Sequence, residues 1–260
     1  ATILVGAVSA SDVNDTGAAV EDTSQNDLSA VNEIAADNLK ASEENMSLAS
    51  NDYDEDLSAQ TDTGVLGEGS AKYSDLAREI SQQGNIKLTH KNYTYDEGET
   101  ITVSEDNKVI DGNGAVIDMN GSTIRAFYIS GSGVTIKNLT IKNANYNGDG
   151  GAIYFSSSAT SGTVSNCNFT DNSATYYGGA VYLSGTGNVT NCNFTGNTAN
   201  NGGAIRMYSG TVSNCNFTGN TATSQGGAIR FSSTGTVSNC NFTDNTAYRG
   251  GAVYFLNNGN

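Results

Sequence analysis

The chain has 260 residues, with 27 acidic and 12 basic side chains and a net charge of −15. It contains 31 Gly and neither Pro nor Trp, which excludes collagen and Pro-rich linkers and argues against a helical globule. No apolar run approaches the roughly 18 residues of a membrane-spanning helix, so we expect no membrane span in this segment. The basic residues form no cluster, which argues against nucleic acid as a partner.

The first ten residues look like the end of a secretory signal. Thr2 to Val8 is mostly apolar, and Val8-Ser9-Ala10 then places small residues at the positions that a signal peptidase reads. A short apolar strand is the alternative interpretation. We expect residues 1–10 to be a signal-peptide remnant and the protein to be secreted or displayed at the cell surface.

Residues 11–69 form a strongly acidic segment. They hold 15 Asp or Glu residues against the single Lys40, so the remainder of the chain is nearly neutral. Low hydrophobicity with high like charge offers too little apolar burial to offset chain entropy. We expect a disordered acidic spacer that is dispensable for folding. Cation binding by the run from Asp52 to Asp56 is the weaker alternative, because this run lacks the spacing and turn glycine of an EF-hand.

Tyr73, Leu76, Ala77 and Ile80 fall at helical spacing, on a segment that ends at Gly84. Residues 70–84 therefore predict one short amphipathic helix. The open end of a stack of strands needs a cover, and we expect this helix to cap the structure that follows.

The second half of the chain repeats with a period of about 24 residues. Glycine pairs recur 28, 24, 24 and 24 residues apart, and each opens a GGA[IV] segment. Between the pairs lie four NCNFT segments, each followed by an Asn two residues later. Short alternating segments separated by Gly, Ser and Asn are typical of brief strands joined by tight turns. The glycine pairs begin at Gly150, Gly178, Gly202, Gly226 and Gly250.

A unit of this length cannot close a core alone, whereas stacked units place like residues over like residues about 4.8 Å apart. The sequence therefore predicts an all-β fold, a right-handed parallel β-helix over residues 85–260. A β-propeller is the rival, but its blades need about 40 residues. The fifth GGA unit stops before its NCNF strand, so we expect a fragment of a longer protein. The predicted inward pairs of one wall are Ile153/Phe155, Val181/Leu183, Ile205/Met207, Ile229/Phe231 and Val253/Phe255.

The four cysteines recur at one-coil spacing, and Leu139 takes the same place one coil earlier. This spacing predicts a single buried column of thiols. Stacked side chains are expected about 4.8 Å apart, farther than a disulfide prefers, although disulfides between neighbouring coils stay open for an exported chain. Cysteines at this spacing do not make a tetrahedron, so we expect neither a metal site nor a cofactor. The column comprises Leu139, Cys167, Cys192, Cys215 and Cys240.

Two outward columns carry candidate sites. The Asn of each NFT triplet faces outward if its Phe faces inward, and each triplet is an N-glycosylation sequon. These candidates are Asn168, Asn193, Asn216 and Asn241. The other wall presents an outward stripe of Tyr and Arg, in which guanidinium groups can stack on aromatic rings. A solvated ladder and a ligand-binding stripe, for a surface glycan or a protein on another cell, both stay open. The stripe comprises Tyr154, Tyr182, Arg206, Arg230 and Tyr254.

The combination of GGA[IV] with F-x-x-N, as in Phe169 to Asn172, resembles the repeats of chlamydial polymorphic outer membrane proteins. It resembles the adhesin-like surface proteins of methanogenic archaea more closely. The segment from Tyr73 to Gly114 is similar to the opening of the pectate-lyase-like β-helix region in those proteins. The resemblance implies export, surface display and often adhesion.

From these observations we predict a non-catalytic adhesin-like or display module, a segment of a larger exported repeat protein. No catalytic residue is predicted. The alternative is a polysaccharide lyase or hydrolase, which needs converging acidic groups. Asp171 and Asp244 are three coils apart, and the single His, His90, lies near the predicted cap. The acids that an enzyme would have to bring together are Asp111, Asp118 and Asp149. Ice binding by Asn-x-Thr columns is a third interpretation, but the sequence lacks a regular Thr-x-Thr array.

Overall fold

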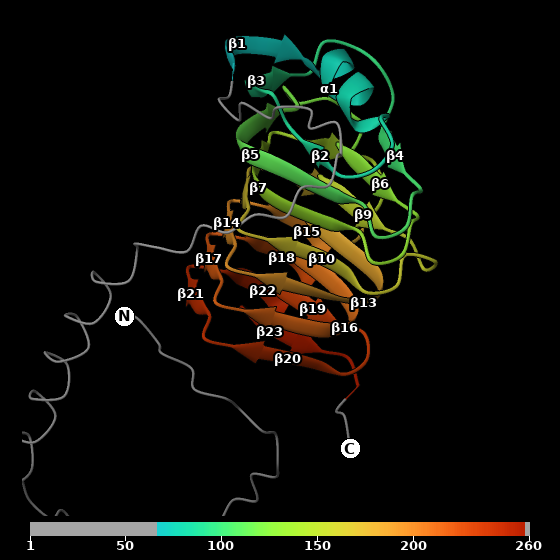
Figure 1. Ribbon diagram of the computed structural model, residues 1–260. Coiled ribbons are helices and arrows are strands. Elements are labelled where there is room, and N and C mark those ends of the chain that lie inside the picture. The colour runs from blue at the N-terminus through green and yellow to red at the C-terminus, as the bar shows by residue number, and fades with distance from the viewer. Residues whose placement is uncertain (1–66, 258–260) are drawn as a thin grey trace, which may run out of the picture. The chain divides into compact units, whose positions relative to one another are not determined.

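The computed structural model of the chain describes residues 67–257. The predicted signal remnant and the acidic spacer up to residue 66 lie outside these residues. Short strands, in which buried apolar side chains alternate with more exposed polar ones, wind into a right-handed parallel β-helix of about seven turns (Figure 1). One short helix, α1 (Tyr73–Ile80), lies at the N-terminal end of the stack. The predicted fold class is confirmed.

The strands form four walls, which we number in the order in which a regular coil visits them. The first wall contains β4 (Ile101–Val103), β6 (Phe127–Ile129), β9 (Ile153–Phe155), the starts of β13 (Val181–Thr190) and β16 (Ile205–Ser213), β19 (Ile229–Phe231) and β23 (Val253–Phe255). The second wall contains β2 (Ile86–Lys87), the starts of β5 (Val109–Asp118) and β7 (Thr135–Lys142), β10 (Gly162–Ser165), the ends of β13 and β16, and β20 (Gly235–Ser238).

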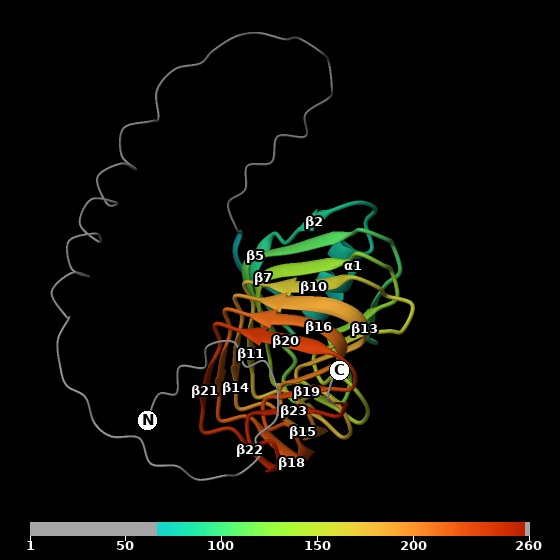
Figure 2. The same ribbon diagram turned by 90° about the horizontal axis from the view of Figure 1, so that it is seen from below.

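The third wall contains β1 (Gly67–Lys72), β3 (His90–Thr94), the ends of β5 and β7, β11 (Asn168–Thr170), β14 (Asn193–Thr195), β17 (Asn216–Thr218) and β21 (Asn241–Thr243). The fourth wall is a separate sheet of β8 (Asn145–Tyr146), β12 (Ser173–Ala174), β15 (Thr198–Asn201), β18 (Thr221–Gln225) and β22 (Thr246–Arg249). Figure 2 shows the second-wall strands in one row and the third-wall strands along another side.

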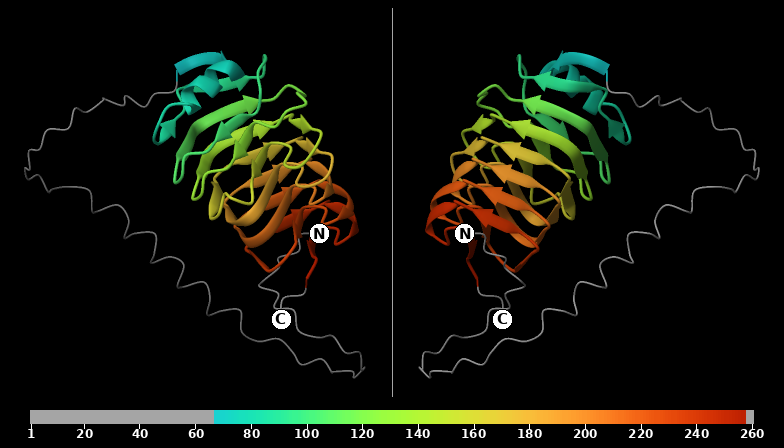
Figure 3. Two further views of the ribbon diagram at one scale, coloured as in Figure 1. Left: turned by 90° about the vertical axis from the view of Figure 1, so that its right-hand side faces the viewer. Right: turned by 90° about the vertical axis from the view of Figure 1, so that its left-hand side faces the viewer.

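Neighbouring coils pair in parallel and place like residues over like residues. In the third wall, Phe194 pairs with Phe217 and Phe217 pairs with Phe242. Their ring centroids lie 4.9 Å and 5.0 Å apart with nearly parallel planes. Figure 3 shows the coils stacked in chain order from α1 to β23. Such stacking gives the repeat a continuous apolar core that no single coil could form.

The cysteine column lies inside this core. All four thiols are free, and the side chains are at most 3% exposed. The backbone N–H of Cys167 donates to Cys192 Sγ, and the backbone N–H of Cys192 donates to Cys215 Sγ, each at 3.4 Å. The hydrogen bond to Cys192, together with burial, raises the pKa of Cys215 to about 12. The prediction of one buried thiol column, with Leu139 at its start at 2% exposure, is confirmed.

Four of the five predicted inward pairs of the first wall are confirmed as buried. Both members are buried in β9, β13, β16 and β19. In β23, Val253 is half-buried and Phe255 is 39% exposed. Phe255 stacks on Phe231, at 4.9 Å between ring centroids, on one side only within the described residues.

Helix α1 covers the first coils. Tyr73, Leu76 and Ile80 are buried and belong to the same core cluster as the strands, and Ala77 packs against it. The Tyr73 hydroxyl donates to the carbonyl oxygen of Ala126 at 2.8 Å and accepts from the Ile101 N–H at 3.2 Å. A buried tyrosine usually finds such partners. The helix therefore caps the stack through both apolar packing and specific hydrogen bonds.

Strand β1 departs from the prediction. Residues 67–69 were expected in the disordered spacer, yet they begin a strand that pairs in parallel with β3. The sequence GEGSAK has little strand propensity. Its conformation is stabilised by pairing with residues about 22 positions away, a contact that local composition does not reveal.

Candidate functional site

The predicted Tyr/Arg stripe forms one aligned column on the first wall. Tyr154 pairs with Tyr182, Tyr182 with Arg206, Arg206 with Arg230, and Arg230 with Tyr254. Tyr128 extends the column by one more coil, because it pairs with Tyr154. These side chains point away from the solenoid core, since they alternate with the buried residues on either side.

The expected exposure of this stripe is wrong for two of its members. Tyr182 is 7% exposed and Arg230 is 8% exposed, while Tyr154, Arg206 and Tyr254 are half-buried. Side chains from two of the turns that precede GGA segments, Tyr177 and Gln225, contact the column. Tyr177, for example, lies with its ring centroid 5.9 Å from that of Tyr182. The stripe is therefore one layer of a two-layered cluster.

The glycine pairs make this second layer possible. Gly178 has φ +62°, and a Cβ there would lie 2.3 Å from the Val181 carbonyl oxygen. A Cβ on Gly179 would lie 2.1 Å from the Gly203 carbonyl oxygen of the next coil. Only glycine permits both the left-handed turn and the close approach. The turn thus folds tightly over the start of β13 and brings Tyr177 against the first wall.

One half of the cluster surrounds Arg125, which is 7% exposed. Its Cζ atom lies 4.0 Å from the ring centroid of Tyr146, 4.6 Å from that of Tyr154 and 5.9 Å from that of Tyr128. The rings of Tyr128 and Tyr154 are themselves stacked at 5.4 Å. A guanidinium enclosed by aromatic faces is held by cation–π attraction, which strengthens when water is excluded.

The other half surrounds Arg206 and Arg230. The Arg206 Cζ atom lies 4.4 Å from the ring centroid of Tyr182 and 5.1 Å from that of Tyr177, and its Nη1 donates to the Tyr182 hydroxyl. Arg230 donates from Nε to Gln225 Oε1 at 3.1 Å and from Nη1 to Ser232 Oγ at 2.7 Å. Burial and, secondly, the charge of Arg206 lower the pKa of Arg230.

Asp149 supplies the carboxylate of the cluster. Burial raises the pKa of Asp149, although the charges of Arg125 and Arg206 act in the opposite direction. Among the described residues, two buried side-chain polar atoms have no hydrogen-bond partner, and they are Asp149 Oδ1 and Arg206 Nε. Unsatisfied buried polar atoms are few in native proteins, and a functional role is one explanation for them. Their position marks this cluster as the candidate site.

We call this set the tyrosine–arginine cluster. It contains Arg125, Tyr128, Tyr146, Asp149, Tyr154, Tyr177, Tyr182, Arg206, Gln225 and Arg230. Arg125, Tyr128, Tyr146, Tyr177 and Gln225 were not predicted from the sequence. The sequence does contain a pattern that could have indicated Tyr177 and Gln225. The residue before each glycine pair differs from coil to coil, whereas the GGA[IV] motif that follows it repeats. These residues are Asp149, Tyr177, Asn201, Gln225 and Arg249.

The candidate sequons lie on the outer face of the third wall, and all four Asn residues are exposed. Each Nδ2 is engaged in a hydrogen bond along the stack. Asn193 donates to Asn168 Oδ1, Asn216 to Asn193 and Asn241 to Asn216, each at 2.8 Å. An attached glycan would replace one Nδ2 hydrogen, and attachment to neighbouring coils would place glycans one strand spacing apart. Glycosylation of these residues stays a prediction.

The acids considered for an enzyme do not come together. Asp111 pairs with Lys137 at 3.2 Å, and Asp118 pairs with Lys142 at 3.0 Å, so each links β5 to β7. Asp149 belongs to the cluster described above. Asp171 and Asp244 are exposed third-wall corner residues with positive φ, separated in the stack by Gly196 and Gly219.

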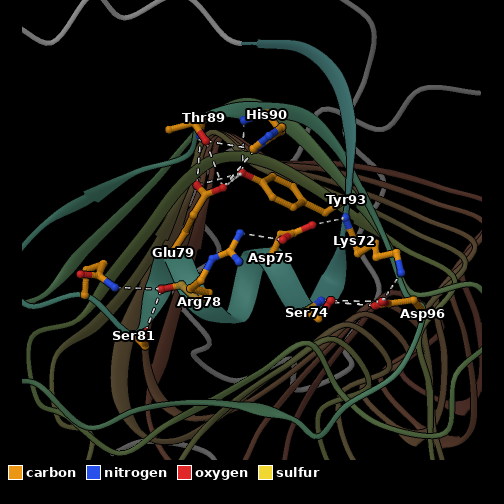
Figure 4. Close-up of polar contacts among 11 residues, drawn as sticks. Lys72, Ser74, Asp75, Arg78, Glu79, Ser81, Thr89, His90, Tyr93 and Asp96 are labelled. Carbon is orange, nitrogen blue, oxygen red and sulfur yellow. Dashed lines mark hydrogen bonds and ion pairs between the residues drawn. The ribbon is translucent and has the colours of Figure 1, made fainter.

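His90 belongs to the cap (Figure 4). Its Nδ1 lies 3.1 Å from Glu79 Oε1, and the same carboxylate accepts from the Tyr93 hydroxyl at 2.9 Å and from Thr89 Oγ1 at 3.0 Å. Burial raises the pKa of Tyr93 to about 12. These contacts tie α1 to the first strands, and all of Glu79's contacts shown in Figure 4 serve that attachment.

The fold and its repeated coils define a right-handed β-helix repeat protein. Residues 159–260 match the family described as "Right handed beta helix region". No curated protein and no solved structure matches the chain. Within residues 67–257, no helix has the length and apolar character that a bilayer crossing requires. In the same range, no group of three or more His, Cys, Asp or Glu side chains is placed to hold a metal ion.

Proposed function

We propose that this chain is a non-catalytic adhesin-like or display module of an exported surface protein, and that it binds its partner through the tyrosine–arginine cluster. The observation that carries the proposal is the pair of unsatisfied polar atoms, Arg206 Nε and Asp149 Oδ1, in a cluster of aromatic rings. Aromatic and arginine side chains are enriched in binding sites.

The rest of the stack supports a display role. The third wall repeats outward Asn and Thr side chains in the four NCNFT coils, and the Asn side chains bond to one another along the axis. A surface whose polar groups satisfy each other offers few free groups to a ligand and makes a stiff support. The resemblance of the GGA[IV] and F-x-x-N repeats to exported surface proteins points in the same direction. We therefore propose a cell-surface or secreted location and a partner on another cell, either a glycan or a protein.

The test is a binding screen of the full chain on glycan arrays and on whole cells, compared with the Arg206→Gln variant. Arg206 is half-buried, so this substitution removes charge and donors with less loss of packing than substitution of Tyr182 or Arg230. We expect binding to one class of surface and at least about a tenfold loss in the variant, as for a charge-assisted hydrogen bond. Unchanged binding by Arg206→Gln, with the thermal unfolding of both proteins matched, would exclude the cluster as the binding site.

A polysaccharide lyase or hydrolase is the second candidate, and Asp149 is the observation that favours it. A partly buried carboxyl with a raised pKa beside arginine side chains is typical of a general acid. Depolymerisation of pectin or a related polyuronate that is lost in Asp149→Asn would establish this activity. Asp111→Asn is the matched control, because Asp111 is ion-paired with Lys137 away from the cluster.

A further inference from the structure

Arg206 and Arg230 are neighbours on consecutive coils, directly paired in the register of β16 and β19. Two guanidinium groups one strand spacing apart repel each other, and more strongly where water is displaced. Acidic residues are scarce in this part of the chain. Residues 143–260 contain only Asp149, Asp171 and Asp244, and the latter two are exposed corner residues of the third wall.

The contacts that hold these two arginines are made by neutral groups. Gln225 and Ser232 accept from Arg230, and the Tyr182 hydroxyl accepts from Arg206. Among residues 67–257, neither guanidinium forms an ion pair. Asp149 acts on Arg125 as well as on Arg206. The cluster thus holds three guanidinium groups and one carboxylate, which acts on two of them, so it has an excess of positive charge.

An anionic group bound between Arg206 and Arg230 would relieve this repulsion and accept charge-assisted hydrogen bonds. The planar guanidinium fork suits carboxylate and sulfate oxygens. Because the aromatic rings keep the surroundings low in dielectric, such an anion would interact more strongly here than on an open surface. Arg206 Nε is a donor without a partner among the described residues, so the Arg206 guanidinium has hydrogen-bonding capacity left for an anion.

The residues around Arg206 and Arg230 favour an acidic sugar over an acidic peptide as the ligand. The ring centroid of half-buried Tyr177 lies 5.1 Å from Arg206 Cζ and 6.0 Å from Arg230 Cζ. Half-buried Tyr254 pairs with Arg230 in the register of the first wall. Sugar rings present C–H groups with partial positive charge, which pack on the negative face of a tyrosine ring. A peptide that added itself as a strand would need a free sheet edge. Strand β16 has none on the first wall, since it pairs with both β13 and β19.

We infer that the Arg206–Arg230 pair binds the acidic group of an anionic sugar, with Tyr177 and Tyr254 packing on sugar rings. The inference rests on the proposed binding function and names its ligand class. Gln225 and Ser232 act as positioning residues, because they hold the Arg230 guanidinium toward its neighbour.

The test is calorimetric titration of the full chain with tetramers of galacturonate, glucuronate and a sulfated galactose. The galacturonate tetramer with its carboxyls methyl-esterified and a tetramer of glutamate serve as comparisons. We expect at least one acidic tetramer to bind, the esterified form to bind at least about tenfold more weakly, and affinity to fall with added salt. Comparison of the carboxylated tetramers with the sulfated tetramer shows which acidic group, carboxylate or sulfate, the site binds.

Arg206→Gln and Arg230→Gln should each weaken binding by at least about tenfold. Arg206→Lys keeps the charge but loses the planar fork, so it should recover only part of the affinity. Arg78→Gln, on the exposed face of α1, makes the same change in net charge and should bind like the parent. Thermal unfolding of each variant separates loss of binding from loss of folding.

Three outcomes would overturn the inference. Equal binding of the charged and esterified tetramers would show a neutral sugar site and would leave the proposed binding function intact. Tighter binding of the glutamate tetramer would make the partner an acidic peptide. If no acidic tetramer binds while cells or arrays still capture the chain, the ligand class is wrong, whereas failure of both experiments would remove the proposed function itself.

Discussion

Two asparagine columns of the same coils differ in their surroundings, although they lie only four residues apart. Asn197 is fully buried, and its side chain makes four hydrogen bonds. Its Nδ2 donates to the Phe169 carbonyl and to Asn220 Oδ1, and its Oδ1 accepts from the backbone and side chain of Asn172. Asn193 is exposed and bonds only to its column neighbours, Asn168 and Asn216. Water can replace the partners of Asn193 and cannot reach those of Asn197.

We therefore expect Asn197→Ala to lower the free energy of unfolding by about 3 kcal/mol or more, because it leaves several buried polar groups unsatisfied. Asn193→Ala, the matched control, should cost less than about 1 kcal/mol. Urea unfolding followed by circular dichroism measures both. Equal losses for the two variants would show that burial does not distinguish the columns.

The burial of the four cysteine thiols leads to a second prediction about single residues, which concerns their reactivity. Burial of all four cysteines, with raised pKa values at Cys192, Cys215 and Cys240, keeps them as unreactive thiols. A disulfide-exchange reagent at pH 8 should label none of the four in the folded chain and all four in denaturant. Rapid labelling without denaturant would instead mean that the coils open locally.

At the scale of elements, the contact between β5 and β7 is linked to pH. Burial alone would raise the pKa values of Asp111 and Asp118. Hydrogen bonds from Asn138 and Asn143, together with Lys137 and Lys142, outweigh burial and lower both pKa values. A carboxyl whose pKa is lower in the folded state contributes stability above its unfolded pKa of about 3.9. That stability is lost as the pH falls below this value and through the folded pKa.

Replacing both acids, as Asp111→Asn with Asp118→Asn, should lower stability at pH 7 and flatten its decline below about pH 4. Thermal unfolding measured at a series of pH values tests this expectation. An unchanged acid profile in the double variant would show that other carboxyls govern acid unfolding.

The same scale shows what sequence could and could not predict. The inward pairs and the thiol column could be predicted because their residues recur at equal spacing, and stacking of the coils brings equally spaced residues into contact. The burial of Tyr182 and Arg230 depends on how the turn at Gly178 folds over the first wall. The spacing of the repeats does not predict the conformation of this turn. Arg125 belongs to an earlier, irregular coil, so the repeat gave no reason to align it with Tyr154.

At the scale of the molecule, each coil contacts its two neighbours, and like residues occupy the same place in every coil. Deletion of residues 203–226 removes one whole coil and joins Gly202 to Gly227, so every column stays aligned. We expect a folded β-helix that is shorter by one coil, with the spectrum of the parent. The deletion removes Arg206, so binding through the cluster should be lost.

Deletion of residues 203–214 is the control, because it removes the first- and second-wall strands of one coil and places third-wall residues against the first wall. We expect the chain beyond the junction to lose its folded structure. Circular dichroism and size-exclusion chromatography distinguish the two products. If both deletions fold equally well, the coil is not the unit of stability.

The parallel strands carry their backbone hydrogen bonds along the axis of the stack, from each coil to the next. A pulling force applied between the two ends of the solenoid therefore loads these coil-to-coil contacts in series rather than all at once. Under tension, coils would detach singly, and each coil of 24 residues would release about 80 Å of extended chain. A tether built in this way lengthens in steps under load, and the coils that have not yet detached keep their side chains in register.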